Sequence, residues 1–380
     1  MNAKVKVEKL DVLMILLSAI QFPIVPNKVF VIYRYFVAVL ELVRYKKEIL
    51  KNKKLVMILS GYTVVLAYST IINTYSITWV ISALMQGTQY IVFFCVFSRF
   101  TKKHGSCEIV NLLISILGVL LLFTDSLMLV IPYNFFDADE FYWVGNKFLV
   151  SYYHCLLACL LYIKYNNSIK RIYSFVAMCY TIFVAACIHC TTGIIIAIVI
   201  VALMCAPKKI KLILQKPVVF ISALAIENVL IWGTTSIFQT PIVVNLVTNV
   251  FHKSADMTGR ARLYAVTLEL VEKSPWWGYG HNTDVYRDLF GYGNAQNGLF
   301  HIVTQAGIVG AILYFCAVYA GIKKAKDDHT LRSYGIYIYI YGMLVGSAIE
   351  INLSTAFLLG VAVIYALNLN YQGRQMTAKK

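Results

Sequence analysis

Charged residues are scarce in this sequence of 380 residues, of which 14% are charged and 59% hydrophobic. The mean hydropathy of +0.70 is too apolar for a soluble protein. The chain also lacks an internal repeat, a Ser/Pro-rich linker and a soluble domain at either end. These absences predict an all-α polytopic membrane protein in which residues 1–380 form a single integral membrane domain.

Cysteine is missing from the long polar segments, since all nine cysteines fall in or beside apolar runs. A disulfide framework is therefore not expected. The first apolar run, 10–25, follows several lysines but has no small-residue cleavage site after it, so we interpret it as a span and not as a secretory signal. The net charge of +16 is spread in short clusters between apolar runs, a pattern that indicates membrane topology and not nucleic-acid binding.

Long apolar runs dominate what is present, and a span needs about 20 such residues, or fewer where its flanks snorkel. The runs predict about twelve transmembrane helices, at residues 10–25, 29–43, 55–72, 77–98, 108–131, 148–163, 172–187, 191–206, 217–237, 298–321, 333–349 and 352–370. With a cytoplasmic N-terminus, the alternate connecting segments hold 26 of the 34 Lys and Arg residues. The positive-inside rule then predicts cytoplasmic N- and C-termini and two extracytoplasmic loops, a smaller one at 132–147 and a large one at 238–297.

The large loop, 238–297, is the segment where function is expected. Residues 258–273 are predicted to form a short surface helix that ends at Ser274-Pro275. Its apolar positions are Leu263, Val266, Thr267, Leu270 and Val271. Such a helix would lie along the membrane surface with its apolar face toward lipid.

Cations gather in this loop, on the side that the positive-inside bias should deplete. Arg260 falls in the first turn of the predicted helix, where free backbone N–H groups and the helix dipole favour an anion. Arg262 reaches the same anion only if that turn is bent or frayed, and Arg287 adds a third guanidinium. A phosphate or pyrophosphate of a substrate is the predicted ligand; contact with anionic lipid headgroups is the alternative.

Candidate general bases lie in the same loop. His281 titrates near neutral pH and is the first candidate for deprotonating a hydroxyl. Asp284 is the catalytic carboxylate candidate, with Glu269 and Glu272 as rivals.

Lys147 and Glu350 stand at the outer ends of predicted spans and could anchor a helix or line a cavity. Lys147 could help to neutralise a phosphate, and Glu350 could pair with an arginine or act as a base. Asp137 and Asp139 in the smaller loop could hold a divalent cation, but an acidic outer loop is more often simply solvated. No metal and no other cofactor is predicted.

Several motifs occur in a characteristic order. They are Thr258-Gly259-Arg260, Tyr264, Ser274-Pro275-Trp276-Trp277-Gly278-Tyr279-Gly280, Asn297-Gly298-Leu299 and Gly307-Ile308-Val309-Gly310. This order resembles the family of O-antigen ligases and Wzy-type polysaccharide polymerases, with the closest match over residues 258–310. Gly145-Asn146-Lys147-Phe148 is similar to a segment of Gram-positive capsule and exopolysaccharide polymerases. Where the family often has His before Asn297, this chain has Gln296, which cannot act as a base; the substitution favours a polymerase over a ligase.

The resemblance implies a membrane glycosyltransferase on the outer face of the bacterial plasma membrane. A hydroxyl of one lipid-linked repeat unit would attack the anomeric carbon of the growing chain and expel undecaprenyl pyrophosphate. The product would be a capsule, an exopolysaccharide or an O-antigen. The implied partners are undecaprenyl-pyrophosphate-linked oligosaccharides and the lipid bilayer, with a chain-length regulator and a flippase as further candidates and no nucleic acid.

The predicted site therefore combines catalytic and substrate-binding residues. His281 or Asp284 would activate the acceptor, and the substrate-binding residues would be Arg260, Arg262, Lys147, Arg287, Asn297 and Glu350. An O-antigen-type ligase that moves finished glycan to another acceptor remains an alternative. A lipid-linked oligosaccharide flippase or transporter is another, although transporters tend to carry charges at mid-membrane, whereas here they cluster in an outer loop.

Overall fold

The computed structural model describes residues 3–20, 22–74, 76–130, 141–165, 169–233, 245, 249, 260–291, 293–323 and 333–378. Helices account for nearly all of these residues. They are α1 (Ala3–Ala19), α2 (Asn27–Arg44), α3 (Lys46–Lys51), α4 (Lys53–Thr74), α5 (Ile77–His104), α6 (Ser106–Val130), α7 (Lys147–Lys164), α8 (Ile172–Cys187), α9 (Thr191–Cys205), α10 (Lys208–Leu214), α11 (Pro217–Gly233), α13 (Arg260–Lys273), α14 (Val285–Phe290), α15 (Gly298–Lys323), α16 (Tyr334–Ser347) and α17 (Thr355–Ala378), with a 3-10 turn at Ile169–Arg171.

All twelve predicted apolar runs overlap helices, but the structure does not support twelve spans. Six described helices are long and apolar enough to cross a membrane, namely α4, α5, α6, α7, the continuous Ile169–Cys187 segment and α15, and a seventh span results if the pair α10 and α11, bent by 80°, is one crossing. The polytopic helical membrane fold is thus confirmed and the count is corrected. Helices α9 and α16 have only 15 and 14 residues, about 22 Å of rise, and α2 carries four charged side chains.

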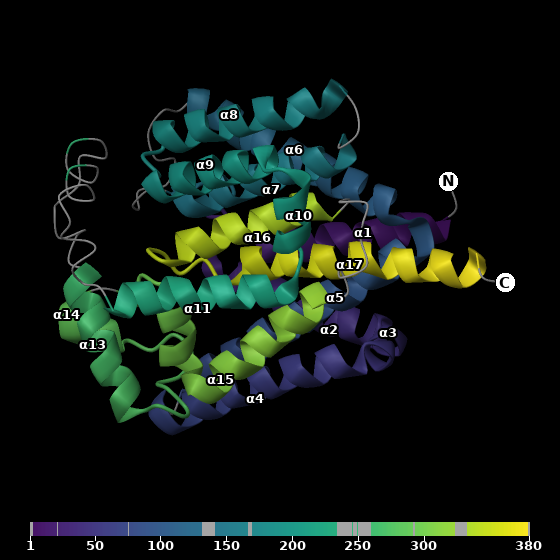
Figure 1. Cartoon of the computed structure of the whole chain (residues 1–380). Coiled ribbons are helices and arrows are strands. Elements are labelled where there is room, and N and C mark those ends of the chain that lie inside the picture. The colour runs from purple at the N-terminus through teal and green to yellow at the C-terminus, as the bar shows by residue number, and fades with distance from the viewer. Residues whose placement is uncertain are drawn as a thin grey trace.

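The helices form two groups, and the helices α16 and α17 lie between them (Figure 1). In one group α4 packs between α5 and α15, and α5 also contacts α17. In the other, α7 packs against α6, α8 and α9. Helix α16 contacts α7 and α9 on one side and α17 on the other, so it joins the two groups.

Buried tyrosines stabilise that junction. Tyr334, Tyr337 and Tyr339 of α16 are fully buried, and a buried hydroxyl needs a hydrogen-bond partner. Each donates to a backbone carbonyl of a neighbouring helix: Leu203 at 2.8 Å, Ile322 at 2.9 Å and Ala356 at 3.3 Å respectively. The short helix α16 is therefore tied by specific hydrogen bonds to α9, α15 and α17.

Apolar side chains also cover the outside of the bundle. On α6 and α8 these include residues that are each more than half exposed: Val119, Leu122, Leu129, Val176 and Phe183. Exposed aliphatic residues in such numbers are costly in water and favourable against lipid tails, as expected for an integral membrane protein.

Part of the large predicted loop is folded. The surface helix expected at 258–273 is present as α13, and α14 follows it. Its apolar face does not point to lipid: Leu263, Tyr264 and Leu270 are at most 4% exposed and pack with Tyr286 and Phe300 in a small separate core. The predicted helix and its apolar face are confirmed, but the prediction that this face meets lipid is wrong, because other side chains of the protein cover it.

The smaller predicted loop is described only from residue 141 onward, so Asp137 and Asp139 lie outside the described residues. Strands β1 (Phe141–Tyr142) and β2 (Gly145–Asn146) pair antiparallel there. Figure 1 shows α13 and α14 at one end of the bundle and both marked chain ends at the opposite end.

Candidate functional site

The centre of the candidate site is a break in helix α15. Gly307 has φ 65° and ψ −174°, which interrupts the helical hydrogen bonding. The turn that follows α13 replaces the lost partners: the Tyr279 N–H donates to the Thr304 carbonyl at 2.7 Å, and the Gly280 N–H donates to the Gln305 carbonyl at 2.9 Å. In return the N–H of Ile308 donates to the Pro275 carbonyl at 2.8 Å. The Ser-Pro-x-x-Gly-x-Gly segment is therefore docked, backbone to backbone, into the kink.

Two glycines permit this close approach. A Cβ on Gly307 would lie 2.1 Å from the Trp276 carbonyl oxygen, and one on Gly278 would lie 2.5 Å from the Thr304 carbonyl oxygen. Both residues also have positive φ, a conformation that other residues adopt at a cost. The glycines that the sequence placed in the family motif thus serve the contact between turn and helix.

The docked turn delivers His281 into the bundle. Its N–H donates to Thr70 Oγ1 of α4 at 2.9 Å, and its Nε2 lies 3.0 Å from Ser82 Oγ of α5. The side chain is only 9% exposed, and its Nδ1 is buried without a hydrogen-bond partner in the described part of the chain. If Nε2–H donates to Ser82, the Nδ1 lone pair is available to accept a proton.

The surroundings keep His281 neutral. Burial lowers the pKa of His281 to about 4, and the positive charge of Arg34 and electrostatic coupling to the neighbouring His301 act in the same direction. A neutral imidazole at physiological pH can accept a proton from a hydroxyl. An anion bound beside it would offset the positive field and raise this pKa.

Arg34 is a candidate site residue that the sequence analysis did not single out. It lies within α2, half-buried, and donates to Gln89 Oε1 at 2.6 Å. Its Nε is buried with no partner in the described ranges. An arginine inside an apolar run is costly and commonly marks a binding site. That single charge within the predicted span 29–43 was the available signal, and averaging hydropathy over the run concealed it.

A second polar group lies around the end of α16, where the Ala348 carbonyl accepts hydrogen bonds from Tyr264 at 2.7 Å and from Asn297 Nδ2 at 3.3 Å. Asn297 also caps α15, since its Oδ1 accepts from the Phe300 N–H at 2.9 Å. The predicted binding residue Asn297 is thus a buried helix cap. Its carbonyl also accepts the first backbone hydrogen bond of α15, from the N–H of His301 at 3.0 Å.

Glu227 of α11 is the second missed residue. Ser347 Oγ donates to its Oε2 at 3.4 Å, and the N–H of Ala348 also hydrogen-bonds this carboxylate. Its Oε1 is buried without a partner among the described residues. Glu227 interrupts the predicted span 217–237, and it was overlooked for the same reason as Arg34.

Lys147 and Glu350, which the sequence analysis considered separately, lie in one electrostatic neighbourhood. Lys147 begins α7 and Glu350 follows α16, both half-buried. Both charges act on the Cys190 thiol, and Glu350 also acts on Tyr152. They therefore share one neighbourhood at the ends of α7, α9 and α16, two residues from the Ala348 carbonyl.

The remaining predicted residues are placed differently. Asp284 and Arg287 form an ion pair at 3.1 Å on the surface of α14, with side chains 58% and 67% exposed. Their charges face solvent and each other. Arg260 and Arg262 lie in the first turn of α13, and their side chains lie outside the described residues. Glu269 and Glu272 are exposed on α13.

Comparison with known proteins bears on this geometry. Residues 148–315 match the family model described as O-antigen ligase, a segment that includes α13, His281, Asn297 and the kink of α15. No curated protein sequence matches the chain. The resemblance to this family is thereby confirmed, and it supports a role in polysaccharide assembly at the membrane without distinguishing a ligase from a polymerase.

Proposed function

We propose that this chain, with its O-antigen ligase segment, polymerises lipid-linked oligosaccharide repeat units by glycosyl transfer. An acceptor hydroxyl oxygen attacks the anomeric carbon of the donor chain, and the bond from that carbon to the undecaprenyl pyrophosphate oxygen breaks. The hydroxyl proton passes to a base on the protein. The pyrophosphate leaves as an anion, so it needs cationic stabilisation and no protonation.

The observation that carries this proposal is a neutral histidine, held by the turn that docks at the kink of α15, within electrostatic range of the half-buried Arg34. His281 Nδ1 and Arg34 Nε are both buried and unpartnered within the described residues, and Arg34 contributes to lowering the pKa of His281. A pyrophosphate bound at Arg34 would neutralise that charge. His281 would then become a stronger base when the donor is in place.

The other residues fall around this pair. We assign Arg260 and Arg262, in the first turn of α13, to the pyrophosphate together with Arg34. Lys147 and Glu350 would bind glycan or phosphate groups on the other side of α15, with Asn297 holding the first turn of that helix. Glu227 is the second candidate for the base, because one of its carboxylate oxygens has no partner in the described structure.

We assign the base to His281 in preference to Asp284, since Asp284 is exposed and paired with Arg287. These two residues would at most contact the glycan at the rim of the site. The family match supports a ligase equally well. We favour a polymerase because the residue before Asn297 is Gln296, whose amide cannot accept a proton in place of the family's histidine.

The topology proposed from the charge count puts this site on the outer face of the bacterial plasma membrane, with both termini in the cytoplasm. Repeat units would then reach the site only after a flippase has moved them outward. A chain-length regulator would be a further partner of the growing polymer.

The test is the size distribution of lipid-linked and surface glycans in a deletion strain, with and without a plasmid copy. A polymerase predicts that single repeat units accumulate while long chains vanish, and that the plasmid restores them. Long chains stranded on the lipid would instead identify a ligase. Repeat units trapped on the cytoplasmic leaflet would identify a flippase.

A further inference from the structure

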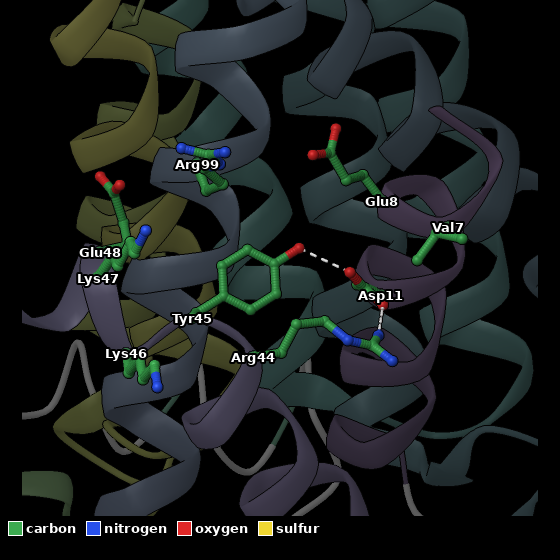
Figure 2. Close-up of a pocket in the computed structure, with 9 residues that line it drawn as sticks. All are labelled: Val7, Glu8, Asp11, Arg44, Tyr45, Lys46, Lys47, Glu48 and Arg99. Carbon is green, nitrogen blue, oxygen red and sulfur yellow. Dashed lines mark hydrogen bonds and ion pairs between the residues drawn. The ribbon is translucent and has the colours of Figure 1, made fainter. Parts of the chain in front are cut away.

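A cavity of about 340 Å³ opens at the end of the bundle opposite to the α13–α15 site. It lies between the first half of α1, the junction of α2 with α3, and the last turns of α5 (Figure 2). Ser82, beside His281, and Arg99, in this cavity, are both on α5 and 17 residues apart, which corresponds to about 25 Å along the helix. This cavity is therefore separate from the site of the proposed reaction.

The carboxylates of this cavity are already neutralised. In Figure 2 the side chains of Arg44 and Tyr45 both point at Asp11. The ion pairs and hydrogen bonds here are Asp11 with Arg44 and Tyr45, Glu8 with Lys103 and His104, and Glu48 with Lys102. A buried carboxylate is stable only with such partners, so none of the three is available to bind a further cation.

Three cations remain over. Arg99, Lys46 and Lys47 line the cavity, and none of them has an ion pair or hydrogen bond with a carboxylate in the described residues. The segments that meet here contain two more acidic residues. Glu108 pairs with Lys9, whereas Glu41 shares Arg44 with Asp11 and so offsets one of these three positive charges. The C-terminal stretch 369–380 contains no Asp or Glu. Among the described residues, positive charge at this end is therefore in excess, and an anion from outside the chain would balance it. Residues 324–332, which contain Asp327 and Asp328, lie outside the described residues.

The helices that form the cavity also carry exposed apolar side chains, of which Val7 lines the cavity itself. Val7 and Leu10 of α1, Val43 of α2 and Leu50 of α3 are between 46% and 74% exposed. A basic cavity bordered by such a surface suits a ligand with a phosphate headgroup and hydrocarbon chains. A soluble phosphate compound would use the cations but would gain nothing from the apolar border.

We propose that this cavity binds the phosphate group of an anionic phospholipid, with Arg99 as the principal contact and Lys46 and Lys47 at the rim. By the charge count, the lipid belongs to the cytoplasmic leaflet. Its binding would fix α1, α2 and α5 relative to the bilayer. Lipid binding at this end is independent of the reaction proposed at the other end.

The experiment is native mass spectrometry of the purified, delipidated protein in detergent, titrated with phosphatidylglycerol, phosphatidylcholine or inorganic phosphate. Wild-type protein is expected to bind phosphatidylglycerol about tenfold more tightly than phosphatidylcholine. Arg99→Gln combined with Lys46→Gln should lose about that factor, the value expected for one charge-assisted hydrogen bond. Lys53→Gln with Lys54→Gln is the matched control, because these lysines are exposed on α4 and do not line the cavity.

Equal binding of the two lipids, or unchanged binding by the Arg99 and Lys46 variant, would overturn the proposal. Displacement of phosphatidylglycerol by inorganic phosphate at comparable concentration would overturn the lipid assignment and identify a free anion as the ligand. Arg99→Lys keeps the charge and should keep most of the binding. If Arg99→Lys binds and Arg99→Gln does not, at equal melting temperatures, misfolding is excluded as the cause.

Discussion

The two ends of the helix bundle treat their charged groups in opposite ways. At the α1–α2–α5 end, each carboxylate has a basic partner, although Glu41 shares Arg44 with Asp11 and its Oε2 is buried without a partner in the described residues. Of the surplus cations, Lys46 and Lys47 are exposed and Arg99 is half-buried. At the α13–α15 end, His281 Nδ1, Arg34 Nε and Glu227 Oε1 are buried without a partner in the described residues. Unpaired buried polar atoms cost stability and persist where a ligand completes them. Carboxylates with basic partners thus prevail at the end where we propose lipid binding, and a histidine, an arginine and a glutamate that each have an unpartnered atom prevail at the end that we propose is catalytic.

The largest effect is expected from Gly307→Ala. The added Cβ would meet the Trp276 carbonyl at 2.1 Å, and alanine is strained at φ 65°, so the turn must leave the kink. We expect the free energy of unfolding to fall by about 3 kcal/mol or more and glycosyl transfer to be lost. Thermal unfolding in detergent measures the change in stability. Gly118→Ala is the control, because nothing lies within 4 Å of its added Cβ. Equal stability of both variants would show that docking of the turn is dispensable.

Arg34→Gln should reduce the rate of glycosyl transfer by about 100-fold or more, the range for removing a preorganised contact to developing negative charge. Arg34→Lys should fall between this variant and wild type, because lysine keeps the charge without the planar donor geometry. The measurement is the initial rate of polymer formation at matched protein levels. Lys28→Gln, an exposed position on the same helix, should leave the rate near wild type. A normal rate for Arg34→Gln would remove Arg34 from the site.

His281, at the proposed catalytic end, should make the stability of the protein depend on pH. Its pKa is about 4 in the folded protein and about 6.5 in an unfolded chain, so between these values the unfolded state binds more protons. Stability is therefore complete above about pH 6.5 and falls by on the order of 3 kcal/mol as the pH drops to 4. His281→Gln should remove this contribution and so reduce the slope of melting temperature against pH over this interval. His189→Asn, at an exposed position, should leave the wild-type slope; an unchanged slope in His281→Gln would contradict the assigned pKa.

The smallest effect is expected at the paired end. Lys9 and Glu108 form an ion pair at 3.8 Å with side chains 34% and 52% exposed. Solvent and salt screen such a pair. Glu108→Gln should change stability by less than about 0.5 kcal/mol and leave polymer length unchanged. A large loss in denaturant titrations would mean that this end depends on single surface pairs.

Sequence patterns predicted the elements better than their contacts. Apolar runs located the helices, and the 3.6-residue period over 258–273 located α13 and its buried face. They did not predict the number of spans, because helices such as α16 are shorter than their apolar runs. The break at Gly307 was also out of reach, since its cause is the contact with Pro275 and Trp276, about thirty residues earlier in the chain.

The candidate site was predicted only in part. His281 was identified because histidine in a polar loop is conspicuous, whereas Arg34 and Glu227 were hidden inside hydrophobic runs. Asn297 was expected to bind substrate, but its side chain is used to cap α15. Asp284 and Arg287 looked reactive as single residues, yet helical spacing pairs them on the surface. Tertiary contacts decide which polar residues are free to act, and a linear pattern does not contain them.

The most direct test uses the purified protein in liposomes with a lipid-linked repeat unit as the only substrate. We predict that wild-type protein extends the glycan and releases one lipid pyrophosphate for each unit added. Protein carrying both Arg34→Gln and His281→Gln should do neither, while melting within a few degrees of wild type. Chain extension by the double variant at the wild-type rate would contradict the proposed catalytic site. Failure of the wild-type protein to extend the glycan would contradict the proposed polymerase.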